Sequence, residues 1–128
     1  MYIFGGGTAG VSLNDLWAYA LGARAWTQVV SAGGSAPSPR GGTSLVPLGN
    51  RLVLFGGSDP NVASSFDSAL YCFDMQRRRW SRLAVGGEHS RARNYHAAIP
   101  CGGGVLIFGG RSSSGERLND TFLLRVWP

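Results

Sequence analysis

Short apolar runs recur along the chain, and each of them ends in a pair of glycines. The runs YIFGG, LVLFGG and LIFGG occupy positions 2–6, 52–57 and 106–110. A run of this length between turn signals is typical of a buried β-strand. The segment after the first run, VSLNDLWAYAL, alternates aromatic with small or aliphatic residues, which also favours a strand over a helix. The pattern therefore predicts an all-β chain built from short strands.

The first glycine cluster, FGGGTAG at 4–10, also fits the G-x-G-x-x-G pattern of dinucleotide-binding proteins. That interpretation requires a helix directly after the glycines and an acidic residue about 20 positions further on. The following segment is predicted to be a strand, and no acidic residue lies between Asp15 and Asp59. The sibling clusters FGGSDPN and FGGRSSS keep the two glycines and lose the rest. We therefore interpret the cluster as the end of a strand and expect no cofactor.

Several further features repeat in the same register as the glycine pairs. The phenylalanines before the glycines, Phe4, Phe55 and Phe108, are 51 and 53 positions apart. The other matching segments are RGGTSLVP at 40–47 with RNYHAAIP at 93–100, LNDLW at 13–17 with LNDTF at 118–122, and the aromatic pairs Tyr19 with Trp26 and Phe73 with Trp80. Chance clustering of glycine does not produce a shared register, so the chain contains an internal repeat of about 50 residues.

This repeat resembles the kelch repeat, in which an apolar strand ends in two glycines and is followed by a strand with an aromatic residue and then by a tryptophan. The resemblance covers essentially the whole chain, with two mild departures: DSA at 67–69 replaces LND, and Phe73 replaces tyrosine. It implies four-stranded antiparallel blades of a β-propeller. The residues that carry the repeat are Gly5, Gly6, Gly56, Gly57, Gly109, Gly110, Tyr19, Trp26, Phe73 and Trp80.

Naming the strands of a blade a to d from the centre outward divides the chain into about two and a half blades. Residues 1–30 form an incomplete first blade with strands b to d, 39–84 a complete blade, and 92–128 a third blade with strands a to c. We expect Trp26 and Trp80 to lie between neighbouring blades. Propellers close with 4 to 8 blades, so the ring is incomplete. Additional blades or a second copy of the chain would complete it.

Composition narrows the class of protein. The hydrophobic fraction is 44%, and no apolar run reaches the length of a membrane span. We expect no membrane partner and, since the start MYIFGGG lacks the features of a signal peptide, a cytoplasmic location, with the nucleus as the alternative. Cys72 and Cys101 have no metal-site spacing and are expected to be reduced and structural. The net charge of +5 comes from 12 basic residues, all of which are arginine.

The residues needed for catalysis do not form a recognisable constellation. His89 and His96 are the two histidines, and neither belongs to a metal-binding motif. His96 lies on a predicted inner strand and is interpreted as structural. Asp15 and Asp120 belong to the repeat, where we expect the Asn-Asp pair to fix a turn through side-chain to backbone bonds. We therefore predict that the chain is not an enzyme and holds no metal.

The predicted topology places the long loops on one face of the propeller. The b–c and d–a connections share that face and are long and rich in serine and glycine, which is typical of binding loops on a rigid scaffold. Kelch adaptors that capture acidic peptides use arginines in comparable places. This resemblance implies a partner-binding patch of five arginines, namely Arg40, Arg91, Arg93, Arg111 and Arg117. Arg77, Arg78, Arg79 and Arg82 cluster near the opposite face.

Three functions remain open from the sequence. The first is a non-catalytic protein–protein interaction module of the adaptor or scaffold type, whose partner is another protein with an acidic segment. The second is a fragment of a kelch-type enzyme that acts on a sugar or another small molecule. The third is an arginine-rich nucleic-acid binder, which is the least favoured because aromatic residues are not interleaved with the arginines.

Overall fold

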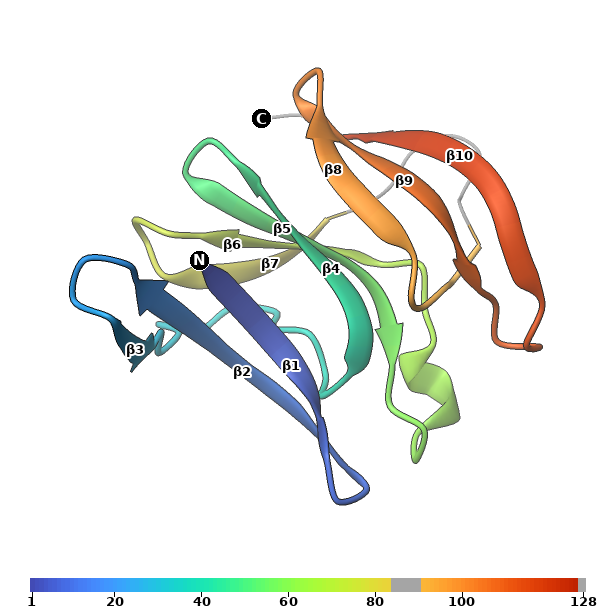
Figure 1. Ribbon diagram of the computed structural model, residues 1–128, viewed down its shortest axis with the longest axis horizontal. Coiled ribbons are helices and arrows are strands. Elements are labelled where there is room, and N and C mark those ends of the chain that lie inside the picture. Colours follow the sequence, from blue (N-terminus) through green and yellow to red (C-terminus); the bar gives the residue numbers. More distant parts are fainter. Residues whose placement is uncertain (84–90, 127–128) are drawn as a thin grey trace.

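Ten strands form three antiparallel sheets in the computed structural model, which describes residues 1–83 and 91–126 (Figure 1). The first sheet has the order β1-β2-β3, with β1 Tyr2–Thr8, β2 Val11–Ala20 and β3 Ala25–Gln28. The middle sheet has the order β4-β5-β6-β7, with β4 Gly41–Leu48, β5 Arg51–Ser58, β6 Leu70–Asp74 and β7 Arg79–Leu83. The third has the order β8-β9-β10, with β8 Ala97–Cys101, β9 Gly104–Arg111 and β10 Arg117–Arg125.

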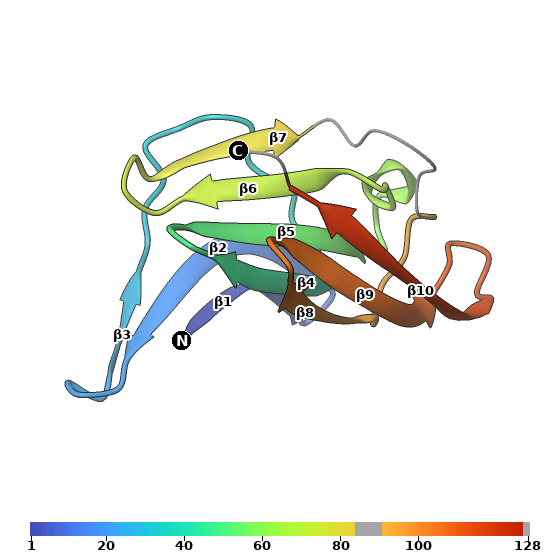
Figure 2. The same ribbon diagram turned by 90° about the horizontal axis from the view of Figure 1, so that it is seen from above.

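These sheets confirm the predicted all-β fold with an unclosed ring. Strand β4 contacts both β1 and β8, so the three sheets meet along their inner strands. Figure 2 shows the strands of the middle sheet in the order β4 to β7, with the first sheet on the left and the third sheet on the right. A short 3₁₀ turn, η1 Ala63–Ser65, interrupts the long β5–β6 connection. The structure does not describe residues 84–90 and 127–128. The predicted ends of the second and third blades, at residues 84 and 128, and His89 therefore lie outside the described residues.

The core lies in two layers between the sheets. Strand β5 has an almost continuous apolar sequence because both of its faces are covered. Leu52 and Leu54 belong to the cluster shared with the first sheet, whereas Val53 and Phe55 belong to the cluster shared with the third. Successive side chains of a strand point to opposite faces, so one run of β5 serves two interfaces.

The first two glycine pairs, Gly5–Gly6 and Gly56–Gly57, lie where neighbouring sheets meet. The first glycine of each pair has a positive φ, as at Gly5 with 62° and Gly56 with 71°. A Cβ atom on Gly56 would collide with the carbonyl oxygen of Arg93 in the third sheet, and one on Gly5 would collide with that of Arg40 in the middle sheet. The N–H of the next glycine, Gly57, donates to the same Arg93 carbonyl at 2.9 Å. The backbone of the next blade therefore excludes a side chain at Gly5 and Gly56.

The linker between the first two sheets covers the outer edge of β7. The N–H of Trp80 donates to the carbonyl of Gly33 at 3.1 Å, and the N–H of Ser35 donates to the carbonyl of Trp80 at 3.0 Å. A Cβ atom on Gly34 would collide with the Trp80 carbonyl oxygen. An uncovered edge strand is a site of unwanted pairing, so this linker protects the middle sheet.

The two repeat tryptophans lie in different environments. Trp80 is 5% exposed and packs against Phe4 of the first sheet, with ring centroids 5.5 Å apart. Trp26 is 45% exposed, because no described residue covers its outer side. The expectation that both tryptophans lie between blades therefore fits Trp80 and not Trp26.

Cys72 is buried and Cys101 is exposed, and neither forms a disulfide. Burial raises the pKa of the Cys72 thiol. Within residues 1–83 and 91–126, no helix has the length and apolar character needed to span a membrane.

Candidate partner-binding face

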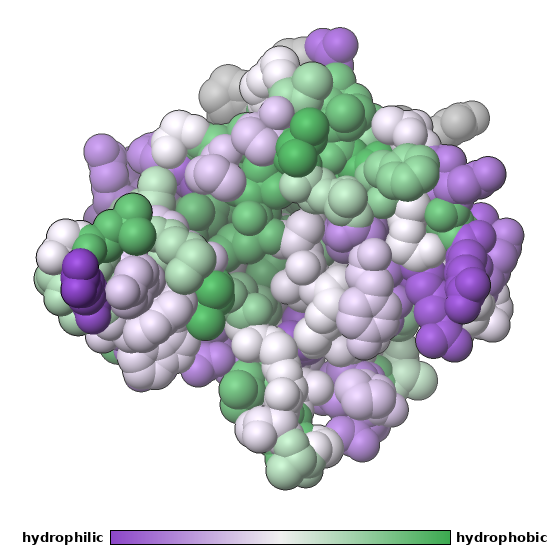
Figure 3. All heavy atoms as spheres, viewed as in Figure 1, coloured by the Kyte–Doolittle hydropathy of each residue, from purple (hydrophilic) through white to green (hydrophobic). Residues whose placement is uncertain are grey.

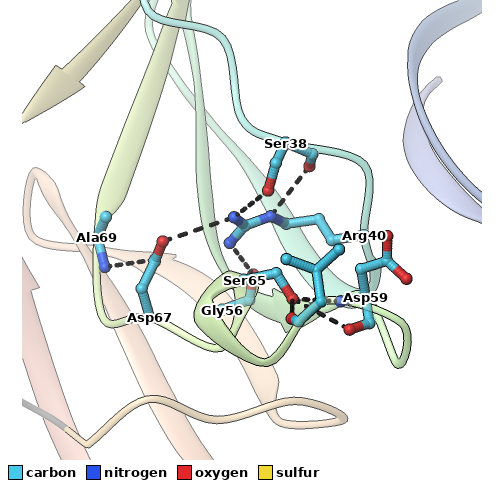
Figure 4. A network of polar contacts seen from close by, with 8 residues as sticks. Ser38, Arg40, Gly56, Asp59, Ser65, Asp67 and Ala69 are labelled. Atoms are coloured by element: carbon cyan, nitrogen blue, oxygen red, sulfur yellow. Dashed lines mark hydrogen bonds and ion pairs between the residues drawn. The ribbon is translucent and has the colours of Figure 1, made fainter.

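Arg40 directly precedes β4, and its side chain has partners on three sides (Figure 4). Its guanidinium donates to the hydroxyl and carbonyl oxygens of Ser38, at 2.8 and 3.1 Å, and to the carbonyl of Gly56 at 3.4 Å. The carboxylate of Asp67 lies 3.6 Å away, and the Tyr71 ring lies beneath the guanidinium at 5.4 Å. The side chain is 1% exposed.

Arg93 occupies the same place in the third sheet, with tighter contacts. Two of its nitrogens donate to the two carboxylate oxygens of Asp120 at 2.7 and 2.8 Å, and one also donates to the carbonyl of Gly109 at 2.7 Å. The Phe122 ring lies 4.8 Å from the guanidinium carbon. These hydrogen bonds from Arg93 hold the pKa of the Asp120 carboxyl below its ordinary value. The middle and third repeats therefore each join the start of their inner strand to their own glycine pair through a buried arginine.

These contacts correct two expectations from the sequence. Arg40 and Arg93 are 1% and 0% exposed, so they do not contribute to an exposed patch. Asp120 lies at a β-bulge in β10, between Leu118 and Thr121, where it pairs with Arg93 instead of fixing a turn. Asp15 lies in strand β2 and accepts a hydrogen bond from the Trp17 indole at 2.7 Å. The sequence showed that Arg40 and Arg93 occupy matching positions in the repeat. The burial of their side chains depends on how the strands pack.

The other three predicted arginines are exposed on the loop side of the third sheet. Arg91 forms an ion pair with Glu116 at 2.9 Å, with both side chains more than half exposed. Such an exposed pair adds little stability, but it offsets the charge of Arg91. Arg111 ends β9 and Arg117 begins β10, and the two line a common hollow. The structure thus brings Arg111 and Arg117 together and leaves Arg91 beside them.

Two neighbouring grooves open on this face. The central groove, of about 420 Å³, draws its walls from all three sheets and is lined by Gly6, Gly7, Thr8, Ala9, Gly10, Val11, Ser12, Gly41, Ser58, Pro60, Asn94, Tyr95 and Arg111. The side groove, of about 520 Å³, is lined by Tyr95, Gly110, Arg111, Gly115, Arg117 and Leu118. None of the described residues that line either groove is acidic, so both grooves have a positive charge balance.

Tyr95 separates the two grooves and was not singled out from the sequence. Its side chain is 74% exposed, and its φ of 56° lies in the left-handed region, which is rare for a bulky residue. Its N–H donates to the carbonyl of Gly42 at 3.0 Å, which ties it to the middle sheet. Gly42 is its counterpart in the repeat and also has a positive φ, of 69°. The sequence does contain a signal for Tyr95. When RGGT at 40–43 is aligned with RNYH at 93–96, a tyrosine takes the position that is a glycine in the preceding repeat.

Polar side chains join the third blade to the middle sheet, and two of them, Asn94 and Ser58, line the central groove. The Nδ2 of Asn94 donates to the Ser58 hydroxyl at 3.1 Å, and the His96 Nε2 lies 2.8 Å from the Ser44 hydroxyl. Burial, with a smaller effect of Arg93, lowers the pKa of His96 to about 4. His96 is therefore neutral at pH 7. Among the described residues, no group of three His, Cys, Asp or Glu side chains is arranged to hold a metal ion.

Comparison with known proteins places the chain in a family. Residues 1–127 match the family described as the KLHDC2/KLHL20/DRC7 Kelch-repeats domain. The chain is 32% identical over 113 residues to the Rho GTPase-activating protein gacHH of Dictyostelium discoideum, a match that covers 85% of this chain and 7% of that protein. It is 33% identical over 113 residues to the tip elongation aberrant protein 1 of Schizosaccharomyces pombe, which covers 87% of this chain and 10% of that protein.

A third relative is an enzyme by name. The N-(sulfonatooxy)prop-2-enimidothioate sulfolyase of Thlaspi arvense is 33% identical over 92 residues, which cover 71% of this chain and 26% of that protein. The chain therefore spans about a quarter or less of each of these relatives. The chain belongs to the kelch-repeat family, and its three sheets are kelch blades.

Proposed function

We propose that this kelch unit is a protein-interaction module that binds an acidic segment of a partner protein across the central and side grooves. The observation that carries the proposal is the meeting of the two grooves at Tyr95 and Arg111, with no acidic residue among their described lining residues. A partner carboxylate would find a cation there without a competing negative charge.

The chemistry of the two side chains suits such a segment. An arginine binds a carboxylate through two parallel hydrogen bonds, and this geometry adds specificity to the charge attraction. Arg111 and Arg117 are both exposed, and neither forms an ion pair with any described residue. Tyr95 offers a large ring that is already held in place by its backbone bond to Gly42. A preformed aromatic surface loses little conformational entropy on binding.

The contacts that hold the groove walls in place also favour a binding function, because they make the site rigid. The walls of the central groove are held to one another across sheets, as in the hydrogen bond from the Asn61 amide to the carbonyl of Gly10 at 2.8 Å. The paired arginine and glycine positions fix the inner strands below it. Binding residues on loops over a rigid scaffold are a common arrangement.

Selection from a displayed pool of short peptides rich in Asp and Glu tests the proposal, with a matched pool in which Asn and Gln replace the acids. We expect enrichment of the acidic pool. The change Arg111→Glu should weaken the selected peptides by about tenfold or more, the loss of one charge-assisted contact. Arg82→Glu, an exposed arginine of β7, is the matched control and should leave binding unchanged.

Two results would contradict the proposal. One is equal enrichment of the acidic and amide pools. The other is equal binding by the Arg111→Glu and wild-type proteins. Binding of single-stranded RNA that falls steeply with salt and is lost in Arg82→Glu would instead assign nucleic-acid binding to the opposite face.

A further inference from the structure

Arg111 and Arg117 face each other directly across the β9–β10 hairpin. They are paired residues in the register of the two strands, and the side chains of directly opposite residues lie on the same face of a sheet. Both line the side groove, both are exposed, and neither forms an ion pair with any described residue. Two like charges in this position destabilise a hairpin, so the stability of the fold does not explain the pair.

The repeat does not require these two charges. In the first sheet the corresponding residues, Gly7 and Ser12, also lie directly opposite each other in β1 and β2, and both are uncharged. In the middle sheet the counterpart of Arg111 is Ser58, at the end of β5. Figure 3 shows strongly hydrophilic residues at the right-hand edge of the molecule, where the end of the β9–β10 hairpin lies in Figure 1. The third blade therefore carries a pair of positive charges at a place where the first blade has two small neutral residues.

Backbone contacts hold Arg111 in place. Its N–H donates to the carbonyl of Asn94 at 2.9 Å, and the N–H of Asn94 donates to the carbonyl of Arg111 at 3.0 Å. The Arg111 guanidinium lies against Gly115 in the hairpin loop, since a Cβ atom on that glycine would be 3.2 Å from its Nη2. One cation of the pair is therefore positioned before any ligand binds, which reduces the entropy cost of binding.

The charges around the pair favour an anion with two negative charges. Arg91 and Glu116 neutralise each other in an ion pair at 2.9 Å, which leaves Arg111 and Arg117 uncompensated by the described residues. A carboxylate supplies one negative charge, and so does each phosphate of a nucleic-acid backbone. A phosphate monoester on serine or threonine carries a charge of about −1.5 to −2 at pH 7 and has three acceptor oxygens. Arginine binds phosphate through pairs of parallel hydrogen bonds, so the monoester is the anion that matches both side chains.

We propose that the acidic segment of the partner protein carries a phosphorylated serine or threonine, whose phosphate group binds between Arg111 and Arg117 in the side groove. This inference rests on the proposed function and names the residue that the segment places in this groove. The other residues that line the side groove are uncharged, namely Tyr95, Gly110, Gly115 and Leu118. The phosphate therefore meets no carboxylate among the lining residues, and the neighbouring central groove accepts the residues on one side of it.

Peptide pools that differ at one fixed position test the proposal on the whole chain. Their central residue is phosphoserine, glutamate or serine, and their flanking positions are the same random mixture rich in Asp and Glu. We expect the best phosphoserine peptide to bind about tenfold more tightly than its glutamate version, because only the phosphate engages both arginines. Arg117→Gln should reduce this ratio to less than about threefold, whereas Arg82→Gln, at an exposed position of β7, should keep it. Circular dichroism checks that both variants are folded.

The pH dependence of the same ratio gives an independent measurement. The second pKa of a phosphate monoester is about 6, that of a glutamate side chain is about 4.3, and arginine stays charged throughout. Lowering the pH from about 7.5 to about 5.5 should therefore weaken binding of the phosphoserine peptide more than that of the glutamate peptide. A purely structural role of Arg117 would not make the ratio depend on pH in this way.

Equal binding of the phosphoserine and glutamate peptides by the wild-type chain would overturn this inference, and the proposed function would stand if both peptides depend on Arg111. A phosphoserine advantage that persists in Arg117→Gln would also overturn it, because the phosphate would then bind elsewhere. Displacement of the phosphopeptide by single-stranded RNA at an equal concentration of phosphate groups would do the same, because a diester would then serve as well. Failure of all three pools to bind would contradict the proposed function itself and the inference with it.

Discussion

The ion pair between Arg93 and Asp120 provides a quantitative test of how each blade is held. In Asp120→Asn the amide group cannot accept both of the hydrogen bonds, of 2.7 and 2.8 Å, that the buried guanidinium donates. Removing one partner of a buried pair costs about 3–5 kcal/mol. The Asp120 side chain is 49% exposed, and solvent screens the loss. The Arg93 guanidinium also keeps the carbonyl of Gly109, so we expect a loss of about 2 kcal/mol.

Asp67→Asn is the matched control within the same chain. Asp67 lies 3.6 Å from Arg40, outside hydrogen-bond distance, and Arg40 retains Ser38 and the carbonyl of Gly56 as acceptors. We expect this change to cost less than about 1 kcal/mol, as for a weak ion pair. Urea unfolding followed by circular dichroism gives the free energy of unfolding of both variants. The slope of the transition checks that each variant unfolds as the wild type does.

The pH dependence gives this prediction a second measurement. The pKa of Asp120 is lowered in the folded state from the ordinary 3.8, so the unfolded chain binds the proton more readily. The contribution of the pair is fully present above pH 3.8 and is lost as the pH falls through the folded pKa. The stability gap between wild type and Asp120→Asn should therefore narrow on acidification. Equal costs for the two substitutions at neutral pH, or a gap that does not narrow in acid, would refute this account of the arginine contacts.

Three further predictions follow from the contacts between sheets. Gly56→Ala should destabilise the fold by several kcal/mol more than Gly49→Ala in urea unfolding, because both have a positive φ but only at Gly56 would the new Cβ meet another strand. Gly34→Ala should detach the linker from β7, detected as faster amide exchange at Trp80, whose carbonyl the new Cβ would meet. Folding lowers the pKa of His96 from 6.5 to about 4, so the unfolded chain binds the proton more readily. The free energy of unfolding of the wild type should therefore drop by up to about 3 kcal/mol as the pH is lowered from 6.5 to 4, and His96→Gln should reduce that drop.

The sequence determined the repeat and most of the fold. The spacing of Phe4, Phe55 and Phe108 set the register, and the apolar run of β5 indicated a strand buried on both faces. These features are local, because a strand buried on two sides must be apolar at successive positions. The first two glycine pairs lie at the contacts between sheets, although the reason for glycine there, a carbonyl oxygen of the next blade, was not visible in the sequence.

The tertiary structure decided which arginines are available to a partner. The sequence predicts both Arg93 and Arg111 on the loop face of the third blade, yet one is buried on Asp120 and the other lines both grooves. Exposure depends on residues far apart in the chain: Asp120 is 27 positions from Arg93. The same holds for Tyr95, which becomes a groove wall only because its backbone bonds to Gly42 of the neighbouring sheet. Sequence periodicity therefore specifies the strands and their order, whereas the packing of one sheet on the next selects the side chains that reach solvent.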